Sequence, residues 1–259
     1  MSELRELYLE ERRQKVLHRV KSEGRVSVLQ LSQEFGVSEV TVRNDLRALA
    51  ERKLIVRTHG GAILAGGGLY ELTLSSRIQQ QVDEKNRIGE AGAAMVLSGD
   101  AIILDSSSTA LSIAAHLKNH RHLTVVTNGL AVAQELQNAP GVTVILTGGK
   151  MRSETFSVVG ATQPDMLRKF NIQKGFFGAH GITIEHGLTD VNADEAEMKH
   201  WLAEMCLQVI AVLDATKWGK VGVVSFVPID RISTVITDSH VPHDLVEQLR
   251  SLKTQIILV

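Results

Sequence analysis

The chain has a single cysteine, Cys206, among its 259 residues. One thiol cannot form a disulfide within the chain, and it excludes a zinc site built from several cysteines. Because Cys206 lies between Met205 and Leu207, we expect it to be a small buried residue. His120 and His122 flank Arg121 in a segment that we expect to be a solvent-exposed loop, so no metal site is predicted.

Long apolar runs are also lacking. The longest stretch without Asp, Glu, Lys or Arg lies between Glu135 and Lys150, and its 14 residues include Pro140. A membrane-spanning helix needs about 20 mostly apolar residues, so no membrane segment is predicted. The first residues are rich in charge where a signal peptide has an apolar run. With 44% hydrophobic and 22% charged residues, we expect a soluble, globular, cytoplasmic protein.

A strong net charge is absent too, since the formal net charge is −1. Residues 1–62, however, carry twelve Lys and Arg against nine Asp and Glu, and the remainder carries sixteen against twenty. A basic short segment and an acidic long one are typical of a small nucleic-acid-binding domain joined to a larger domain. A solvated surface accounts for the small positive excess equally well.

Glycine is concentrated at one place that divides the chain. Residues 60–68 include five glycines and are followed by a polar segment. Glycine's conformational freedom predicts a joint or linker here. We therefore predict an N-terminal domain over residues 1–63, a linker over 64–75 and a second domain over 76–259.

The N-terminal domain has the pattern of a winged helix-turn-helix. Apolar periodicity predicts one helix around residues 16–20 and a second over 28–35, which ends at Gly36. Ser38 is placed as the N-cap of a third helix that extends to about residue 52. Residues 54–63 predict two short strands around a glycine turn.

The third helix has the two faces that a DNA-recognition helix needs. Val42, Leu46 and Leu49 fall on one arc, and the opposite arc carries Val40, Arg43, Asn44 and Arg47. Arg can bond bidentately to guanine and Asn to adenine. A charged, solvated helix face is the alternative interpretation. Arg57 and His59 in the predicted hairpin are candidates for phosphate or minor-groove contact, or for a solvated turn.

Strand-like and helical segments alternate through the second domain, which predicts an α/β fold with a mostly parallel sheet. The expected strands cover residues 101–104, 123–126, 142–146, 175–179, 209–213, 234–236 and 255–259. The expected helices cover residues 109–118, 130–137, 194–205 and 242–252.

Four loops follow expected strands of this sheet and contain hydroxyl, amide or glycine residues. They span residues 105–109, 127–129, 147–150 and 178–181. Ligands of open α/β sheets bind beyond the carboxyl ends of strands, so these loops can converge on a ligand, although each alone is consistent with a simple turn. The Ser-rich turn at residues 106–109 precedes an expected helix, and the N-terminus of a helix suits an anion such as phosphate. Lys217 follows another expected strand and is also placed to meet a phosphate. Neither a Walker A loop nor a Rossmann glycine fingerprint is present, so no nucleotide cofactor is expected.

Two segments of the first domain resemble the DeoR family of bacterial transcriptional repressors. They are Val40-Thr41-Val42-Arg43-Asn44-Asp45-Leu46 and Leu54-Ile55-Val56-Arg57-Thr58-His59-Gly60-Gly61-Ala62. Arg12, Val16, Val20 and Ser38 fit the spacing of the same signature. The resemblance implies that this domain binds double-stranded operator DNA as a dimer or higher oligomer. The DNA-binding residues that we predict on this basis are Ser38, Thr41, Arg43, Asn44, Arg47, Arg57 and His59.

The second domain is similar to the DeoR-family sensor domain, which is related in fold to ribose-5-phosphate isomerases and commonly senses a sugar phosphate. The resemblance implies an effector site composed of Asp105, Ser106, Ser107, Ser108, Thr109, Thr127, Asn128, Gly148, Gly149, Gly178, Gly181, Glu195, Lys199 and Lys217, with Asp214 in the last motif. Ser107 stands where the family usually has glycine, and its side chain narrows the approach of the backbone to a ligand. His180 is a further candidate for a polar contact.

These features predict a homo-oligomeric repressor, a dimer or tetramer, of a carbohydrate-utilisation operon that a phosphorylated sugar releases from DNA. It needs no cofactor and is not an enzyme. One alternative is an active sugar-phosphate isomerase with a fused DNA-binding domain, with Glu195 as its general base. The other is a DNA-binding protein whose second domain only oligomerises.

Overall fold

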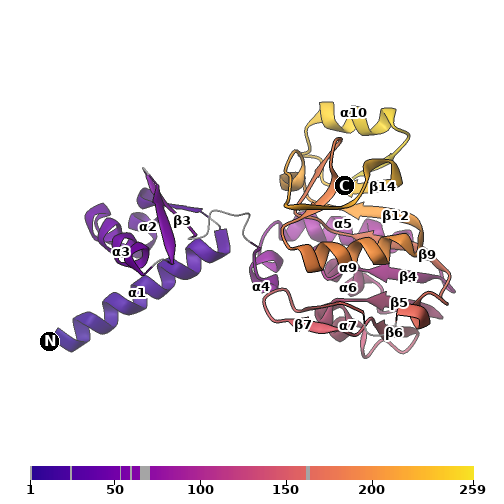
Figure 1. Ribbon diagram of the computed structural model, residues 1–259, viewed down its shortest axis with the longest axis horizontal. Helices are drawn as coiled ribbons and strands as arrows, with labels where there is room; N and C mark the ends of the chain where they lie inside the picture. Colours follow the sequence, from indigo (N-terminus) through magenta and orange to yellow (C-terminus); the bar gives the residue numbers. More distant parts are fainter. Residues whose placement is uncertain (1, 24, 53, 59, 65–70, 162–163) are drawn as a thin grey trace. The chain divides into compact units, whose positions relative to one another are not determined.

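A computed structural model of the chain describes residues 2–23, 25–52, 54–58, 60–64, 71–161 and 164–259. The chain divides into two units, Met1–Ser76 and Arg77–Val259, each of which is described by itself (Figure 1).

The first unit has helices that pack on a small antiparallel sheet. Its elements are α1 (Ser2–Glu23), β1 (Arg25–Ser27), α2 (Val28–Phe35), α3 (Glu39–Glu51), β2 (Ile55–Thr58) and β3 (Gly61–Leu64). The strands lie in the order β1-β3-β2, so the predicted hairpin is present. β1 is not predicted from the sequence, because three residues are too few to show a strand periodicity. Val20, Leu31, Leu46 and Leu49 are buried together in its core.

The turn between α2 and α3 forms through local capping. Ser27 caps α2 by accepting a hydrogen bond from the Gln30 backbone N–H, and Gly36 ends α2 with φ of 61°. Ser38 then caps α3, as predicted, by accepting from the Thr41 backbone N–H at 3.2 Å. These caps fix where the second helix ends and the third begins.

Two helices precede the large sheet and were not predicted. The first, α4 (Leu74–Ile78), begins inside the range expected to be a linker. The second, α5 (Val82–Ala94), contains Gly89 and Gly92, which obscure its apolar pattern. A Cβ at Gly89 would lie 2.5 Å from Ser112 Oγ, and one at Gly92 would lie 2.9 Å from Ile113 Cδ1. Both glycines therefore allow α5 to pack closely against the next helix, α6.

The second unit is built on a seven-stranded, fully parallel sheet, which confirms the predicted fold class. Its strands lie in the order β15-β14-β12-β9-β4-β5-β6. The strands are β4 (Ala101–Leu104), β5 (Leu123–Thr127), β6 (Val142–Leu146), β9 (Ile172–Phe177), β12 (Cys206–Val212), β14 (Ile232–Thr237) and β15 (Gln255–Leu258). The longer helices between them are α6 (Ser108–His116), α7 (Leu130–Leu136), α9 (Ala193–Glu204) and α10 (His243–Ser251).

Side chains of alternate residues in the central strands pack into two hydrophobic cores, one on each face of the sheet. Ile102, Leu104 and Phe176 pack with residues of α5, α6 and α7. Ile103 and Phe177 pack on the other face with residues of α9 and α10. The result is a three-layer arrangement in which helices cover both faces (Figure 1).

Several short elements lie outside this sheet, and none was predicted. They are β7 (Lys150–Arg152), β8 (Ser157–Val159), α8 (Pro164–Leu167), β10 (Gly181–Thr183), β11 (Gly187–Asp190), β13 (Val224–Val227) and two short 3-10 turns, η1 (Ala215–Lys217) and η2 (Ile229–Arg231). β7 pairs with β8, and β10, β11 and β13 form a separate three-stranded sheet.

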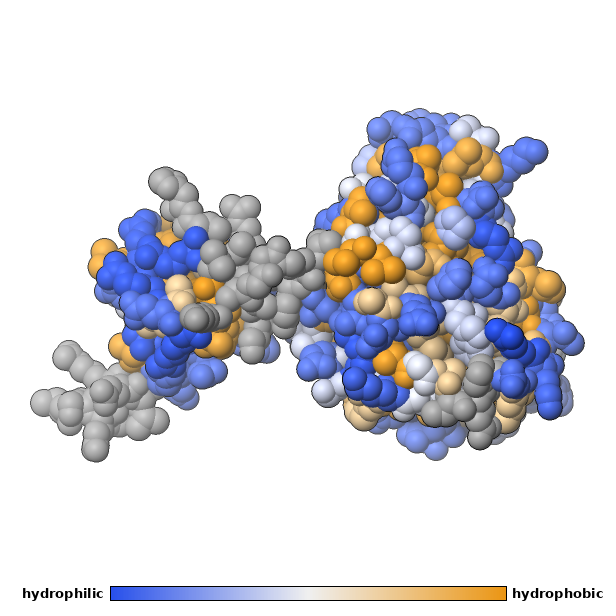
Figure 2. Space-filling view, viewed as in Figure 1, coloured by the Kyte–Doolittle hydropathy of each residue, from blue (hydrophilic) through white to orange (hydrophobic). Residues whose placement is uncertain are grey.

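The surface of the second unit is mixed in polarity. On the face in Figure 2, apolar residues lie among hydrophilic ones. Leu97, Leu207 and Val223 are exposed apolar side chains of this unit. Isolated exposures of this kind are usual, and they assign no function. Among the described helices, none is both long enough and apolar enough to cross a membrane.

Candidate functional site

Helix α3 separates the two arcs that the sequence predicts. Val42, Leu46 and Leu49 are buried in the core of the first unit. The opposite arc is exposed to solvent and carries Val40, Arg43, Asn44 and Arg47. Three polar or charged side chains therefore lie together on the exposed face of a helix whose opposite face packs in the core. This is the arrangement that major-groove contact requires.

Ion pairs hold this helix in place and occupy one of its arginines. Asp45 is buried, and its carboxylate oxygens accept from Arg12 Nε at 2.6 Å and from Arg13 Nε at 3.2 Å, which ties α3 to α1. On the exposed arc, Arg43 Nη2 lies 2.7 Å from Glu39 Oε2. An exposed pair of this kind contributes little to stability, so Arg43 can exchange Glu39 for another anion at low cost.

The other predicted DNA-binding residues lie at the helix start and in the hairpin. Ser38 Oγ and Thr41 Oγ1 lie 2.9 Å apart at the start of α3. Arg57, on β2, is exposed. His59 lies outside the described residues.

The predicted effector residues of the second unit gather where the strand order reverses. The chain proceeds from β4 through β5 to β6 on one side, and β9 then pairs with β4 on the other. Asp105 directly follows β4 and Gly178 directly follows β9, and the Gly178 backbone N–H donates to Asp105 Oδ2 at 3.0 Å. A crevice beyond the carboxyl ends of strands at such a switch point is the usual ligand site of open α/β sheets.

Lys199 is the buried cation at this switch point. Its Nζ lies 2.8 Å from Asp190 Oδ2 and 3.2 Å from Asp105 Oδ2, and it donates to the Gly178 carbonyl at 3.0 Å. Burial alone would lower the pKa of Lys199, but the carboxylates of Asp190, Asp105 and Glu195 together raise it above its usual value. Lys199 therefore remains charged, and Asp190 is a partner that the sequence analysis left out of the site.

Glu195 is the second charged group at the switch point, and four side chains donate hydrogen bonds to it. Its Oε1 accepts from Ser106 Oγ at 2.5 Å and from Asn128 Nδ2 at 3.0 Å. Its Oε2 accepts from Arg152 Nη1 and from Ser157 Oγ, each at 2.8 Å. Burial would raise the pKa of Glu195, but the charge of Lys199 and these hydrogen bonds lower it below the usual value.

Asn128 is fully buried and leaves one polar atom free. Its Nδ2 donates to Glu195 and to the Val158 carbonyl, while its Oδ1 has no hydrogen-bond partner within the described part of the chain. A buried acceptor without a donor is costly unless a ligand or water supplies one. The free oxygen therefore suits a ligand hydroxyl group.

The serine-rich turn lies at the same switch point, where Ser106 contacts Glu195. Ser106, Ser107, Ser108 and Thr109 are all buried. Ser107 is the N-cap of α6 and accepts from the Ala110 backbone N–H at 3.0 Å. A Cβ at Gly178 would lie 2.5 Å from Ser107 Cβ, so the serine in place of the family's usual glycine fills the space beside Gly178.

The remaining predicted residues have visible backbone roles. Thr127 Oγ1 accepts from the Gly129 backbone N–H at 2.9 Å. Gly148 and Gly149 have φ of 69° and 127° and form the turn into β7. Gly181 lies against the backbone of Lys220, where a Cβ would come within 2.0 Å of the carbonyl oxygen. For the glycines these are structural reasons, and they do not require contact with a ligand.

Three contributors were missed by the sequence analysis. Arg152 and Ser157 belong to the β7–β8 hairpin, and nothing in their local sequence indicates that they meet Glu195. Asp190 ends β11, a strand too short to be recognised.

Lys217 lies in η1 and is partly buried, and burial lowers its pKa together with the nearby charges of Lys220 and Arg77. His180 lies near the same cations, and burial and Lys217 lower its pKa.

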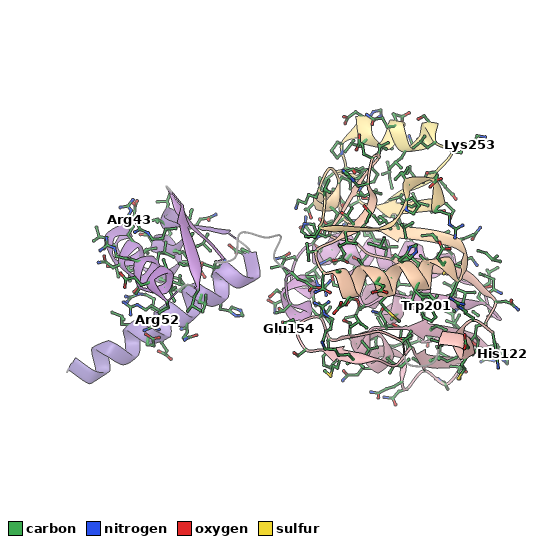
Figure 3. The ribbon with its side chains drawn as sticks, in the orientation of Figure 1. Arg43, Arg52, His122, Glu154, Trp201 and Lys253 are labelled. Atoms are coloured by element: carbon green, nitrogen blue, oxygen red, sulfur yellow. The ribbon has the colours of Figure 1, made fainter. Side chains whose placement is uncertain are left out.

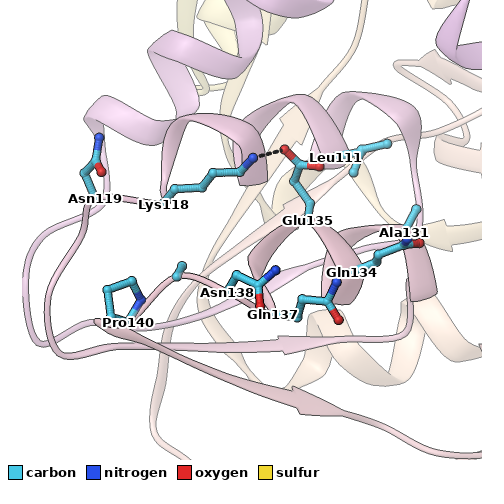
Figure 4. A pocket seen from close by; sticks show the side chains of 10 residues that line it. Leu111, Lys118, Asn119, Ala131, Gln134, Glu135, Gln137, Asn138 and Pro140 are labelled. Atoms are coloured by element: carbon cyan, nitrogen blue, oxygen red, sulfur yellow. Dashed lines mark ion pairs between the residues drawn. The ribbon is translucent and has the colours of Figure 1, made fainter.

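A surface hollow lies elsewhere in this unit, beside the ends of α6 and α7 (Figure 4). Lys118 and Glu135 in its lining form an ion pair of 2.6 Å. Asn119 and Pro140 in its lining precede β5 and β6, so the hollow lies at the amino ends of these strands. None of the predicted effector residues lines it, and it is on the wrong edge of the sheet for the usual ligand site.

Comparison with known proteins identifies both units. Residues 12–66 match the model of the DeoR-like helix-turn-helix domain, and residues 80–239 match that of the DeoR C terminal sensor domain. The HTH-type transcriptional regulator GolR of Listeria innocua is 37% identical, with 89% of this chain and 91% of its own covered. The glycerol-3-phosphate regulon repressor of Escherichia coli is 32% identical, with 94% of this chain and 96% of its own covered.

Among solved structures, a D-ribose-5-phosphate isomerase in complex with phospho-erythronic acid is a distant match. It is 11% identical, with 53% of this chain and 54% of that chain covered, at a TM-score of 0.41. The sequence relatives extend over both units and are named as regulators, not enzymes. The chain belongs to the DeoR family of DNA-binding transcriptional regulators.

Proposed function

We propose that this regulator represses a carbohydrate-utilisation operon and that a phosphorylated sugar or related metabolite releases it from its operator. The first unit reads DNA through the exposed arc of α3. The second unit binds the effector in the crevice between β4 and β9. A homo-oligomer, dimer or tetramer, would present two copies of α3 to a two-fold operator.

The observation that carries the effector half of this proposal is the free oxygen of Asn128. It is a buried acceptor beside a charged network whose other members are already engaged with one another. A polyhydroxylated ligand supplies the donor that the protein lacks. The Ser-rich turn at the start of α6 and the ammonium of Lys217 are the groups that we assign to a phosphate.

The names of relatives support a carbohydrate-linked role. One relative is a glycerol-3-phosphate regulon repressor, which is named for a phosphorylated compound. The isomerase alternative is disfavoured by the environment of Glu195. A general base works best with a pKa near the working pH, whereas four donors and Lys199 lower the pKa of this carboxyl group.

Operator binding with and without candidate effectors tests the proposal. Fluorescence anisotropy of the full chain on DNA upstream of its own operon would be measured with a panel of phosphorylated sugars and the matching free sugars. We expect one phosphorylated compound to weaken DNA binding and its free sugar to have little effect. No DNA binding, or equal effects of both forms, would contradict the repressor and the phosphate parts of the proposal respectively.

A pair of variants locates the effector. Asn128→Ala removes the free acceptor and should reduce the response to the active compound. Asn119→Ala changes an exposed asparagine in the surface hollow and should respond as the wild type does. If both variants respond equally, Asn128 does not contact the effector.

A further inference from the structure

Arg77 has buried donor atoms that nothing in the described part of the chain accepts. It lies on α4, and its Nε and Nη2 are both buried without a hydrogen-bond partner there. A buried guanidinium without an anion is costly, since charged groups lose more on desolvation than neutral ones do. Such an atom pair suggests an anion that binds from outside the chain.

The unpaired edge of Arg77 has the geometry for a two-oxygen anion. Nε and Nη2 form one side of the planar guanidinium, and their N–H bonds are parallel. Two oxygens of a phosphate or carboxylate can accept from this edge together. A single carbonyl or hydroxyl oxygen would satisfy only one of them.

The surroundings of Arg77 are rich in positive charge. Lys85 donates from Nζ to the carbonyl of Gln80 at 2.6 Å and to the carbonyl of Arg77. The pKa of Lys85 is lowered to about 8, mainly by burial, with smaller contributions from the charges of Lys217 and Arg77 that act against the attraction of Asp214. Arg77 also acts on Lys217, whose pKa is lowered by burial and by the charges of Lys220 and Arg77.

Two of the acids near these cations are engaged with other groups. Asp190 pairs with Lys199 at 2.8 Å. Asp214 accepts from the backbone N–H and the hydroxyl of Thr216 within its own turn. A third acid, Glu84, acts on Lys85, and none of the three acids is a hydrogen-bond partner of the Arg77 Nε and Nη2 atoms.

We propose that Arg77 and Lys217 together bind the anionic group of the effector, and that Arg77 sets the preference for a phosphorylated over a free sugar. This assignment rests on the proposed function, because it takes the effector to be phosphorylated. Arg77 supplies the bidentate contact and Lys217 a point charge. The Ser-rich turn at the start of α6 remains part of the same anion site, and Asn128 is left to a hydroxyl group of the ligand.

Titration calorimetry on the full chain tests this assignment. The probes are inorganic phosphate, glucose 6-phosphate, fructose 1-phosphate and glycerol 3-phosphate, each with its unphosphorylated counterpart. For the best phosphorylated probe, Arg77→Gln should weaken binding by about 10- to 100-fold, since a hydrogen bond to a charged group contributes that much. Arg77→Lys should retain part of the affinity, and Arg87→Gln, at an exposed arginine on α5, should retain all of it.

Stability without ligand distinguishes a binding role from a structural one. Because its buried donors have no partner, replacing Arg77 by Gln should leave the urea midpoint of the ligand-free second unit unchanged or raise it. Both tryptophans, Trp201 and Trp218, belong to this unit and report its unfolding. An arginine with a structural role would lower the midpoint.

The outcomes separate the two proposals. If the wild type binds a phosphorylated probe and Arg77→Gln binds it equally well, the assignment of Arg77 is wrong and the proposed function stands. If the wild type binds no phosphorylated probe better than its free counterpart, both are overturned. A lowered urea midpoint for both Arg77→Gln and Arg77→Lys would also overturn the assignment, because it would show a structural role.

Discussion

The carboxylate of Asp105 and the ammonium of Lys199 lie 3.2 Å apart, and both side chains are closed to solvent. Asp105 directly follows β4, and Lys199 lies on α9, so this pair joins the two halves of the sheet at the switch point. Both oxygens of Asp105 are also engaged by backbone N–H groups, of Ser107 at 3.0 Å and of Gly178 at 3.0 Å. The sequence predicts Asp105 as an effector-binding residue, and its contacts give it a positioning role as well.

We therefore expect Asp105→Ala to destabilise the second unit. Breaking a buried ion pair by removing one partner typically costs about 3–5 kcal/mol, and the lower end applies because Lys199 keeps Asp190. Urea unfolding followed by tryptophan fluorescence measures the loss. Asp165→Ala, at an exposed acid, is the control. A loss below about 1 kcal/mol would show that the pair does not support the fold.

Arg43 should contribute to operator binding. Arg43→Ala is expected to weaken the affinity for operator DNA by about 1–3 kcal/mol if the side chain contacts a base. If it contacts a phosphate, the affinities for operator and for unrelated DNA should fall by similar amounts. Arg52→Ala is the matched control, because Arg52 is an exposed arginine at the other end of α3 that pairs with Glu10 (Figure 3). Anisotropy titrations with operator DNA and with unrelated DNA measure the two affinities. Equal losses in the two variants would remove Arg43 from the DNA-binding surface.

Lys85 should give the second unit a rise in stability with pH. Its pKa is lowered from 10.5 to about 8 in the folded chain, so between these values the unfolded chain holds more protons. Stability therefore rises as pH increases through this window, by at most about 3 kcal/mol. The measurement is the difference in unfolding free energy between the wild type and Lys85→Met at pH 7.5 to 10. A difference that stays constant with pH would contradict the lowered pKa.

Cys206 should resist thiol reagents until the second unit unfolds. Its side chain is buried, and burial raises the pKa of the thiol to about 12. Because the thiolate is the nucleophile, labelling of the native protein should be on the order of 1,000-fold slower than in denaturant. An Asn119→Cys variant in a Cys206→Ala background places the thiol at an exposed position and should react at once. Rapid labelling of the wild type in native buffer would show that Cys206 is accessible.

The sequence predicts the parts of this fold that rest on local periodicity. The buried arc of α3 and the seven strands of the large sheet are visible because apolar residues recur at fixed intervals. The strand ends at Asp105, Asn128 and Gly178 follow from the same pattern.

The sequence does not predict what depends on pairing between distant segments. Ser157 and Arg152 meet Glu195 from 38 and 43 positions away, through a hairpin too short to be recognised. Arg77 lies in a segment that resembles a polar linker, and only the burial of its Nε and Nη2 atoms distinguishes it. The α5 helix is not predicted because Gly89 and Gly92 interrupt the apolar periodicity of its sequence. These glycines allow close packing against α6.

The strand order also has a consequence for folding. Contacts such as Ser106 with Glu195 and Asp105 with Gly178 span 89 and 73 positions, so the crevice forms only after β9 docks beside β4. A nascent chain that has completed β4, β5 and β6 still lacks half of the crevice. A ligand of this site binds only the completed unit, and at about 100 times its dissociation constant it would stabilise that unit by about 2.7 kcal/mol. Metabolite supply would then influence the lifetime of the protein in the cell as well as its occupancy of DNA.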